Sequence, residues 1–168
     1  MIRGEWTSLR PASDDDLDQL VGWLGDPEVY RWWEGRPLSR DEVAGVYTGR
    51  RRPEVEPFII EADGVPVGYL QVWQGTETSG GIDLFLVPEA RGRGLGPDAA
   101  RAAASFLLDH RGWSEVTVDP VVDNLRAIRA FERAGFSSES EELDDETGKR
   151  VLRMVVRREG ADVTPADP

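Results

Sequence analysis

The sequence predicts a single mixed α/β domain, in which a mixed sheet of six to seven strands is flanked by helices. The chain has 168 residues, which is enough for one domain with a substantial core. Segments with strand character alternate with segments of helical periodicity, in the order β, α, α, three β, α, β, α, β, β. A buried strand, a glycine-rich turn, a helix and a further strand follow one another between residues 82 and 119, so part of the sheet is expected to be parallel.

The first third of the chain is predicted to hold a short strand at residues 7–10 and three helices. Ser13 precedes three aspartates, and this arrangement begins a helix, because serine can cap it and carboxylates suit the positive end of the helix dipole. Ser39 and Glu42 have the spacing of a capping box. The expected helices run from Ser13 through Leu24, from Pro27 through Trp33 and from Ser39 to Tyr47.

The remainder of the chain is predicted to hold the other strands and two further helices. Asp63-Gly64 is a hairpin signal, and residues 74–81 have the composition of a polar loop. The expected strands cover residues 58–62, 65–73, 82–87, 115–119, 136–143 and 150–157, the last two around a turn at 145–148. The expected helices run from Pro97 to His110 and from a cap at Asp123 or Asn124 to Gly135. The domain then covers residues 1–159, and we expect the small, polar tail 160–168 to be disordered.

The composition narrows the possible functions. A net charge of −12 argues against nucleic-acid binding, and no apolar window is long enough to span a bilayer. The charge suits a cationic substrate, although solubility alone also explains it. The chain has no cysteine, and its one histidine, His110, is expected at the surface, so no metal site is predicted. The N-terminus shows no secretory signal.

The stretch ARGRGLGPDAA, residues 90–100, has the features of an anion-binding turn between a strand and a helix. Its glycines allow unusual φ angles and a close approach of the backbone to a ligand. The first N–H groups of the helix have no internal partner, and the helix dipole strengthens their attraction for phosphate. Arg91 and Arg93 add positive charge. Neither the Walker spacing nor GxGxxG is present, and a tight turn without a ligand is the alternative.

A second motif, NLRAIRAFERAGF at residues 124–136, follows in the same chain. With both motifs, the sequence resembles the GNAT family of N-acetyltransferases. Arg91, Gly94 and Gly96 match that family's RxxGxG pattern, and Asn124, Ala127, Gly135 and Phe136 match its later NxxAxxxYxxxGF pattern. The resemblance extends from about Leu9 to Arg157 and is carried by two motifs in the right order and separation.

The resemblance implies the GNAT fold, with a central pair of splayed parallel strands, here 82–87 and 115–119. It also implies acetyl-CoA as the acyl donor, with its pyrophosphate on the amides of about Arg93–Gly96 and its pantetheine arm between the splayed strands. Strand N–H groups near Leu84–Val87 would hold the thioester oxygen. The cofactor-binding residues that it implies are Leu86, Val87, Arg91, Gly92, Arg93, Gly94, Leu95, Gly96, Asn124, Ala127 and Phe131.

Two positions depart from the family pattern. Pro97 stands where relatives often have a small residue whose N–H meets phosphate, so one phosphate contact is expected to be missing. Phe131 stands where many relatives have a tyrosine that protonates the departing thiolate. Because a thiolate with a pKa of about 8.5 is a tolerable leaving group, we expect Phe131 to slow the reaction without abolishing it.

At finer grain the chain looks like the aminoglycoside 6'-N-acetyltransferases, and it shares much of this pattern with siderophore and lysine side-chain acyltransferases. The matching stretches are YRWWEG at 30–35, PVGYLQ at 66–71, GID at 81–83 and TVDPVVDNLRAIRAFERAGF at 117–136. The resemblance places two aspartates near the acceptor amine, at Asp83 and Asp119, and an acidic residue in the last hairpin, at Asp145 or Glu146. One difference limits the prediction of the acceptor: the loop at 74–80 is shorter than in several aminoglycoside enzymes, where it helps to bind the drug.

The residues themselves support the same acceptor site. Asp83 interrupts an apolar strand, which is costly unless it is paired with an arginine or faces a cleft. There it can bind an ammonium group and remove its proton as the catalytic base. Asp119 ends the next strand, where simple turn chemistry is the alternative. Trp32 and Trp33 can form an apolar wall for the substrate, although at least one is expected in the core.

The resulting hypothesis is an acetyl-CoA-dependent N-acetyltransferase that acts directly, in a ternary complex, on a primary amine of an aminoglycoside. The alternatives are a siderophore or lysine side-chain acyltransferase, and an acyl-CoA-binding module without catalysis. The expected partners are the amine and acetyl-CoA, with no nucleic acid and no membrane, for a monomer or homodimer. The missing signal and the need for acetyl-CoA predict a cytoplasmic location.

Overall fold

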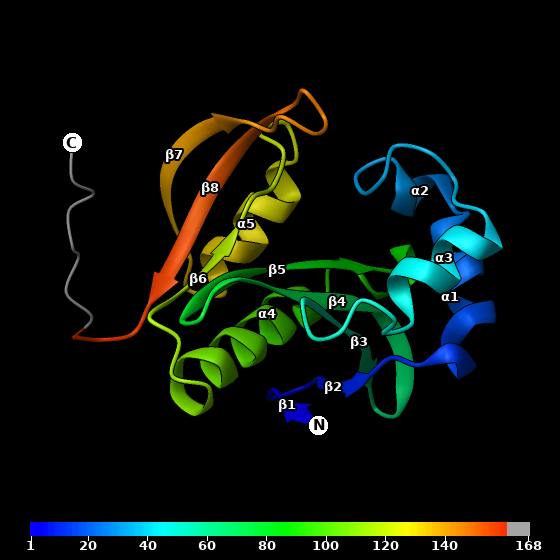
Figure 1. The fold of residues 1–168 in the computed structure, drawn as a ribbon, viewed down its shortest axis with the longest axis horizontal. Coiled ribbons are helices and arrows are strands. Elements are labelled where there is room, and N and C mark those ends of the chain that lie inside the picture. Colours follow the sequence, from blue (N-terminus) through cyan, green and yellow to red (C-terminus); the bar gives the residue numbers. More distant parts are fainter. Residues whose placement is uncertain (161–168) are drawn as a thin grey trace.

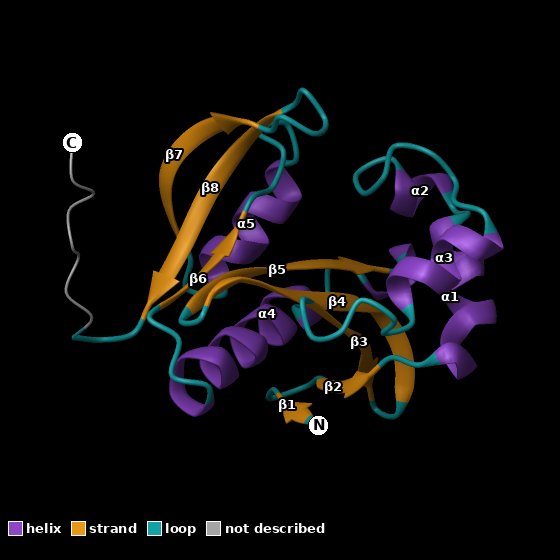
Figure 2. Cartoon of the chain, viewed as in Figure 1, coloured by secondary structure: helices purple, strands orange, loops and turns teal. Residues whose placement is uncertain are grey.

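A computed structural model describes residues 1–160 and shows an eight-stranded mixed sheet in the order β1-β2-β3-β4-β5-β6-β8-β7 (Figure 1, Figure 2). The strands are β1 (Ile2–Arg3), β2 (Ser8–Pro11), β3 (Val55–Ala62), β4 (Val65–Thr76), β5 (Ser79–Leu86), β6 (Glu115–Val118), β7 (Ser137–Leu143) and β8 (Arg150–Arg157). The helices are α1 (Leu17–Leu24), α2 (Pro27–Tyr30), α3 (Arg40–Tyr47), α4 (Leu95–Ser105) and α5 (Leu125–Arg133). A π-helical turn, Phe106–His110, extends α4, and short 3₁₀ turns occupy Asp14–Asp16 and Pro88–Ala90.

Helices cover both faces of the sheet. Successive side chains of a strand point to opposite faces, so both faces carry apolar side chains that the helices bury. One face packs against α1, α2 and α3 through a cluster that includes Leu24, Tyr47 and the strand residues Tyr69 and Phe85. The other face packs against α4 and α5 through a larger cluster. That cluster includes Leu70, Ile82, Ala99, Ala103 and Phe131. The two faces of β5 therefore belong to different cores.

The parallel strands β5 and β6 diverge along their length. They pair through three residue pairs only, Ser79–Gly81 with Glu115–Thr117. β5 then continues to Leu86, whereas β6 ends at Val118 and pairs antiparallel with β8. The predicted parallel segment and its splay are confirmed, and the side of β5 that would face β6 is open beyond Gly81.

The sequence correctly predicted seven of the strands, and it missed β1 because two residues are too few for a periodicity signal. The predicted loop at 74–81 is wrong, since β4 extends to Thr76 and β5 begins at Ser79. Glycines in this stretch serve close packing: a Cβ on Gly80 would lie 2.1 Å from the Trp73 carbonyl oxygen, and one on Gly81 2.2 Å from the Trp73 ring. Apart from Gly160, the predicted tail 160–168 lies outside the described residues.

Two helix boundaries also differ from the prediction. Helix α2 ends at Tyr30, so Trp32 and Trp33 lie in the turn that follows it. Helix α4 begins at Leu95, which makes Pro97 its third residue and not its first. A proline is still accommodated there, because N–H groups of the first turn have no acceptor within the helix. The cap of α5 is resolved in favour of Asn124, whose side chain accepts a hydrogen bond from the Ala127 N–H.

The start of α4 is fixed to the N-terminal segment by one buried carboxylate. Asp98 accepts hydrogen bonds from the backbone N–H groups of Glu5, Trp6 and Thr7 and from the Thr7 hydroxyl, at 2.6–3.1 Å. Burial acts to raise the pKa of Asp98, but these hydrogen bonds outweigh it and hold the pKa below its usual value. The anchored segment in turn holds the N-terminal end of α4 in place.

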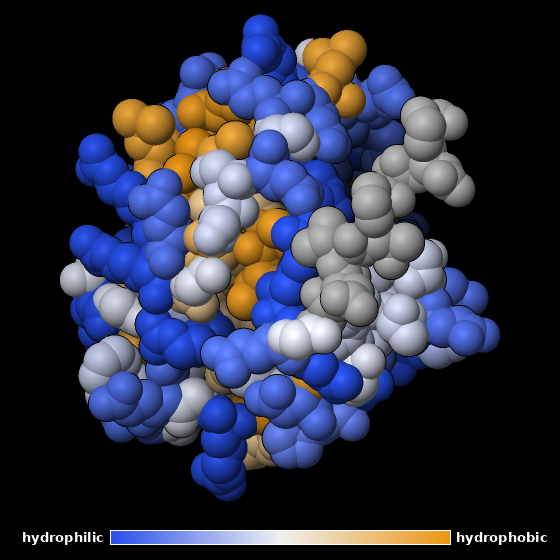
Figure 3. All heavy atoms as spheres, turned by 90° about the vertical axis from the view of Figure 1, so that its left-hand side faces the viewer, coloured by the Kyte–Doolittle hydropathy of each residue, from blue (hydrophilic) through white to orange (hydrophobic). Residues whose placement is uncertain are grey.

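The side of the molecule at β7 and β8 is mostly hydrophilic, with apolar side chains exposed between polar ones (Figure 3). All seven residues of β7 are exposed, and its carboxylates pair with arginines of β8. Glu139 bonds Arg153 and Arg157, and Glu141 bonds Arg150. These glutamates belong to the solvated hairpin face. Within residues 1–160, no helix is both long and apolar enough to cross a membrane.

Candidate active site

Two neighbouring cavities lie along the C-terminal half of β5. We call the first, of about 490 Å³, the basic cavity, because its walls include four arginines: Arg91, Arg126, Arg129 and Arg133. We call the second, of about 290 Å³, the acidic cavity, because its walls include five carboxylates: Glu34, Asp83, Asp119, Asp144 and Glu146, beside one lysine. Both cavities are lined by Trp32, Trp33, Leu84, Asn124 and Ala127. Molecules that fill the two cavities would meet at Leu84.

The glycine turn forms one end of the basic cavity. Gly92 and Gly94 have φ angles of 75° and 78°, in the left-handed region that favours glycine. The first hydrogen bond of α4 joins the Asp98 N–H to the Gly94 carbonyl at 3.2 Å. Leu95 and Gly96 line the cavity, and their N–H groups precede this bond, so they have no acceptor within the helix. This is the arrangement that binds phosphate at helix N-termini.

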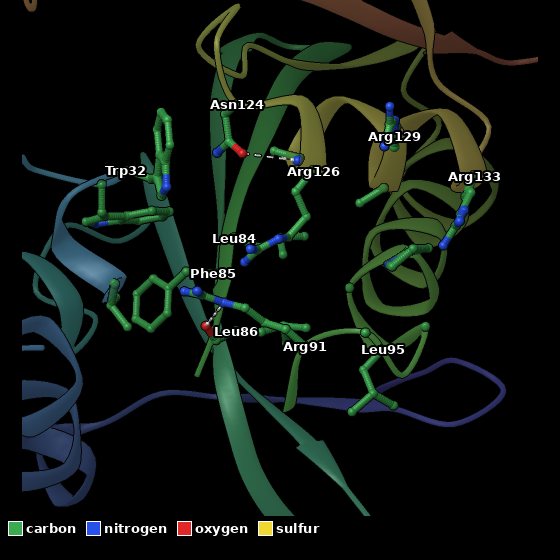
Figure 4. A pocket seen from close by; sticks show the side chains of 18 residues that line it. Trp32, Leu84, Phe85, Leu86, Arg91, Leu95, Asn124, Arg126, Arg129 and Arg133 are labelled. Atoms are coloured by element: carbon green, nitrogen blue, oxygen red, sulfur yellow. Dashed lines mark hydrogen bonds between the residues drawn. The ribbon is translucent and has the colours of Figure 1, made fainter. Parts of the chain in front are cut away.

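Arg91 connects the walls of the basic cavity. Its Nε donates to the Leu86 carbonyl at 3.3 Å, at the end of β5 (Figure 4). Its Nη2 donates to the Glu28 carbonyl of α2 at 2.7 Å. Burial, together with the positive charge of Arg126, lowers the pKa of Arg91. The same side chain therefore contributes positive charge and holds α2 against the sheet.

The open side of β5 presents the backbone of alternate residues. The Val87 N–H, just after β5, donates to the Val67 carbonyl of β4 at 2.9 Å. In an antiparallel pair, every second residue of a strand forms its backbone hydrogen bonds with the partner strand. Phe85 and Asp83 therefore also bond β4, and the backbone groups of Leu84 and Leu86 face the gap toward β6. The Leu86 carbonyl is used by Arg91. The Leu84 backbone thus points into the gap at the point where the cavities meet.

Asp83 lies on the side of β5 that faces the acidic cavity. Its Oδ2 accepts a hydrogen bond of 3.0 Å from Gln71 Nε2, and Gln71 Oε1 accepts one of 3.1 Å from the Tyr69 hydroxyl. Burial raises the pKa of the Asp83 carboxyl, and the hydrogen bond from Gln71 offsets this only in part. No arginine pairs with Asp83 among the described residues, so the structural alternative of a buried ion pair does not hold.

Asp119 follows β6 and lines the same cavity. Burial, together with the negative charges of Asp83 and Asp144, raises the pKa of Asp119 to about 7. Two carboxyls with raised pKa values thus approach one cavity from two splayed strands. Such a pair can bind a cation strongly and can accept a proton near neutral pH.

Aromatic side chains form the wall of the acidic cavity opposite α5. Trp33 is half-buried, packs against Phe85 with ring centroids 5.1 Å apart, and donates from Nε1 to the Tyr47 hydroxyl at 2.8 Å. The Tyr47 hydroxyl in turn donates to Glu34 Oε1 at 2.8 Å, and burial raises the pKa of Tyr47. Trp32 remains 38% exposed. Trp33 therefore packs against the core, as expected for at least one of the two tryptophans, and both side chains line the cavities.

The structure brings most of the predicted site residues to these cavities. Leu86, Arg91, Gly92, Gly94, Leu95, Gly96, Asn124 and Ala127 line the basic cavity, and Trp32, Trp33, Asp83, Asp119 and Phe131 line the acidic one. Three predicted residues lie outside the lining. The Val87 N–H is bonded to Val67, and Arg93 lies at the exposed tip of the turn. Of the two candidates in the last hairpin, Asp145 lies outside the lining, whereas Glu146 lines the acidic cavity together with Asp144.

Several lining residues escaped the sequence analysis. Gln71 and Glu34 lie in the matching stretches PVGYLQ and YRWWEG, but neither was singled out, because their contacts with Asp83 and Tyr47 join distant segments. The row of arginines on α5, at residues 126, 129 and 133, had a detectable signal, because i, i+3 and i+7 lie on one face of a helix.

Comparison with known proteins is consistent with this geometry. The family model described as "Acetyltransferase (GNAT) domain" matches residues 12–143. An aminoglycoside N(6')-acetyltransferase type 1 from Klebsiella pneumoniae is 32% identical over 146 residues, covering 77% of this chain and 73% of that protein. A spermidine N(1)-acetyltransferase from Escherichia coli K12 is 24% identical over 137 residues, covering 79% and 74%.

Solved structures give the same result. The structure of AAC(6')-Ib in complex with ribostamycin and coenzyme A superposes with a TM-score of 0.84 and 27% identity, covering 98% of this chain and all of that one. The similarity thus extends over both cavities and not only over the two sequence motifs.

Proposed function

The chain belongs to the GNAT family of acetyltransferases, and from this premise we propose that it transfers the acetyl group of acetyl-CoA to a primary amine of a polycationic small molecule, the 6'-amine of an aminoglycoside. Acetyl-CoA would occupy the basic cavity and the amine the acidic cavity. The observation that carries the proposal is the contact of the two cavities at Leu84, with opposite charges on either side.

The basic cavity fits the donor in shape and charge. The N–H groups of Leu95 and Gly96 are placed to receive its pyrophosphate, with Pro97 contributing none. The gap between β5 and β6 can receive the extended pantetheine arm, because within residues 1–160 the β5–β6 pairing ends at Gly81 and leaves the β6 side of Leu84 without a strand. The N–H of Leu84 is then the closest available donor to the thioester oxygen.

The acidic cavity fits a cation with several amino groups. Asp83 and Asp119 would bind the reacting ammonium, while Glu34, Asp144 and Glu146 would attract the remaining positive charges. The aromatic wall at Trp32 and Trp33 suits the apolar face of a sugar ring. The relatives named for aminoglycosides support an aminoglycoside as the acceptor, and the spermidine acetyltransferase offers a polyamine as the comparison substrate.

The proposed reaction is direct transfer in a ternary complex. Asp83 accepts a proton from the ammonium, and the free amine nitrogen attacks the thioester carbonyl carbon. A C–N bond forms, the C–S bond breaks, and the sulfur leaves with the electron pair of that bond. The described residues that line the acidic cavity include no tyrosine, and Phe131 has no proton to give, so the thiolate takes its proton from water or from the substrate.

A panel of acceptors tests the proposal through release of the free thiol. Acetyl-CoA should turn over with kanamycin and ribostamycin faster than with spermidine. An aminoglycoside analogue that carries a hydroxyl in place of the 6'-amine should lose most of the activity, and mass spectrometry should find one acetyl group on the product. Binding of acetyl-CoA without thiol release across the panel would instead indicate an acyl-CoA-binding module.

A further inference from the structure

Helix α5 presents a row of three arginines to the basic cavity: Arg126, Arg129 and Arg133 (Figure 4). They occur at i, i+3 and i+7, so they share one face of the helix. At 1.5 Å per residue the row extends about 10 Å along the helix axis. The two ends of the row can therefore contact different groups of one extended ligand.

The charge of this row is not used within the described part of the protein. Nine arginines elsewhere in residues 1–160 form ion pairs with carboxylates: Arg10, Arg31, Arg36, Arg40, Arg50, Arg111, Arg150, Arg153 and Arg157. Over the same residues, the side chains of the α5 row make neither an ion pair nor a hydrogen bond. In a chain of net charge −12, three arginines that face one cavity without an acidic partner indicate an anionic ligand.

Arg126 lies near Arg91 and the turn, whereas the other end of the row, at Arg133, reaches a later part of α4. The groups that fit the pyrophosphate belong to the turn 92–96 at the start of α4. The row instead follows α5, whose last turn contacts α4 farther along, where Arg101 Nη2 donates to the Arg133 carbonyl at 2.9 Å. An anion held by Arg129 and Arg133 would therefore be distinct from an anion held at the turn.

We propose that the α5 row binds the 3'-phosphate on the ribose of CoA. This inference rests on the proposed function, since it assumes that CoA occupies the basic cavity. CoA carries three phosphates, and the turn accounts for the two of the pyrophosphate. A guanidinium can bind the third, terminal phosphate through two parallel hydrogen bonds. The row thus makes the enzyme specific for CoA over donors that lack the 3'-phosphate.

Two donors test the assignment: acetyl-CoA and acetyl-dephospho-CoA, which differ only in the 3'-phosphate. The wild-type chain should use acetyl-CoA with a kcat/KM about tenfold or more higher, mainly through a lower KM. The double variant R129Q/R133Q should lose most of this preference, by losing acetyl-CoA efficiency while its efficiency with acetyl-dephospho-CoA changes little. Equal losses with both donors would overturn the assignment, because the row would then serve the pyrophosphate.

The matched control is Arg50→Gln, which removes a positive charge from an exposed arginine that pairs with Asp14 and lines neither cavity. It should keep the donor preference, and a preference lost equally in this control would contradict the assignment. Competition with adenosine 3',5'-bisphosphate against ADP provides a readout without catalysis, and only the wild-type chain should favour the bisphosphate. If wild-type protein binds both donors equally, this inference alone fails. If it binds neither, the proposed function fails, and this inference with it.

Discussion

The basic and acidic cavities use the same strand and the same helix, yet they obtain their charge in opposite ways. The basic cavity relies on backbone N–H groups at a helix start and on arginines without acidic partners. The acidic cavity relies on carboxyls whose pKa values are raised by burial, so their ionisation costs folding free energy. The comparison teaches that the basic cavity needs little reorganisation to bind an anion, whereas the acidic cavity gains most when a cation arrives.

The largest effect is expected at Asp83. Asp83→Asn keeps the size of the side chain and an acceptor for Gln71, but removes the proton acceptor. We expect kcat to fall by about 10²-fold or more, the size of a general-base contribution, with a small change in the KM for acetyl-CoA. Steady-state thiol release measures both, and Asp123→Asn, an exposed aspartate outside both cavities, is the control. A loss below about threefold would contradict the role of Asp83 as base.

The same variant should be more stable than the wild type at high pH. The pKa of Asp83 is raised in the folded state, so the unfolded chain ionises first as the pH rises, and folded-state stability is lost above the unfolded pKa of about 3.9. Asp83→Asn removes this penalty. Thermal unfolding should show a higher Tm for the variant at pH 8 and no difference near pH 4. A variant that is less stable at pH 8 would mean that the charge is stabilised in the fold.

The next effect concerns Asp119. With a pKa of about 7, this carboxyl ionises within the assay range, and the ionised form binds the ammonium. We expect kcat/KM for the acceptor to rise with pH below about 7, by up to about tenfold per unit, and then to level. In Asp119→Asn the rise of kcat/KM with pH should become smaller or shift to another pH, while the pH dependence of CoA binding should stay unchanged. An identical pH profile in the variant would exclude Asp119 as its source.

A smaller effect on the donor side is expected at Gly94. Its φ of 78° disfavours any residue with a Cβ, and that Cβ would sit at the start of α4. Gly94→Ala should cost about 1 kcal/mol of stability and raise the KM for acetyl-CoA by up to about tenfold, with kcat nearly unchanged. Gly148→Ala, also at positive φ but in the β7–β8 turn, controls for the backbone strain. Equal donor KM values in the two variants would count against a phosphate site at the turn.

The smallest effect is expected from Phe131→Tyr. The ring is buried on α5 and lines the acidic cavity, and many relatives have at this position a tyrosine that protonates the thiolate, so under the proposed function the added hydroxyl supplies the missing proton donor. Because the thiolate leaves readily, we expect kcat to rise only about two- to threefold. Single-turnover measurements check the chemical step itself. A fall in kcat with unchanged stability would show that the ring is needed for its apolar contacts.

The sequence predicted the strand–turn–helix unit around Arg91–Gly96 because glycines, charge and periodicity are local signals. The sequence also located Asp83, which lines the acidic cavity, because a carboxylate within an apolar strand is again a local signal. The turn requires glycines at positive φ, and Asp83 contrasts with its apolar neighbours, so one chain was enough to find both.

The features that the sequence did not reveal depend on contacts between distant segments. Gln71 of β4 bonds Asp83 of the neighbouring strand β5, and Glu34, in the turn after α2, is bonded by Tyr47 of α3. The glycines at 80 and 81 were interpreted as a loop because their role, close packing against Trp73, depends on the neighbouring strand. Asp145 alternates with Asp144 and Glu146 in a turn, where a shift of one residue reverses which side chain meets the cavity.

The most direct test of the account is a crystal structure of the chain with CoA and ribostamycin bound together. The account predicts CoA in the basic cavity with its sulfur next to Leu84, in the gap between β5 and β6. It also predicts the 6'-amine within hydrogen-bond distance of Asp83, on the other side of Leu84. An amine bound away from Asp83, or a CoA bound outside the basic cavity, would contradict it.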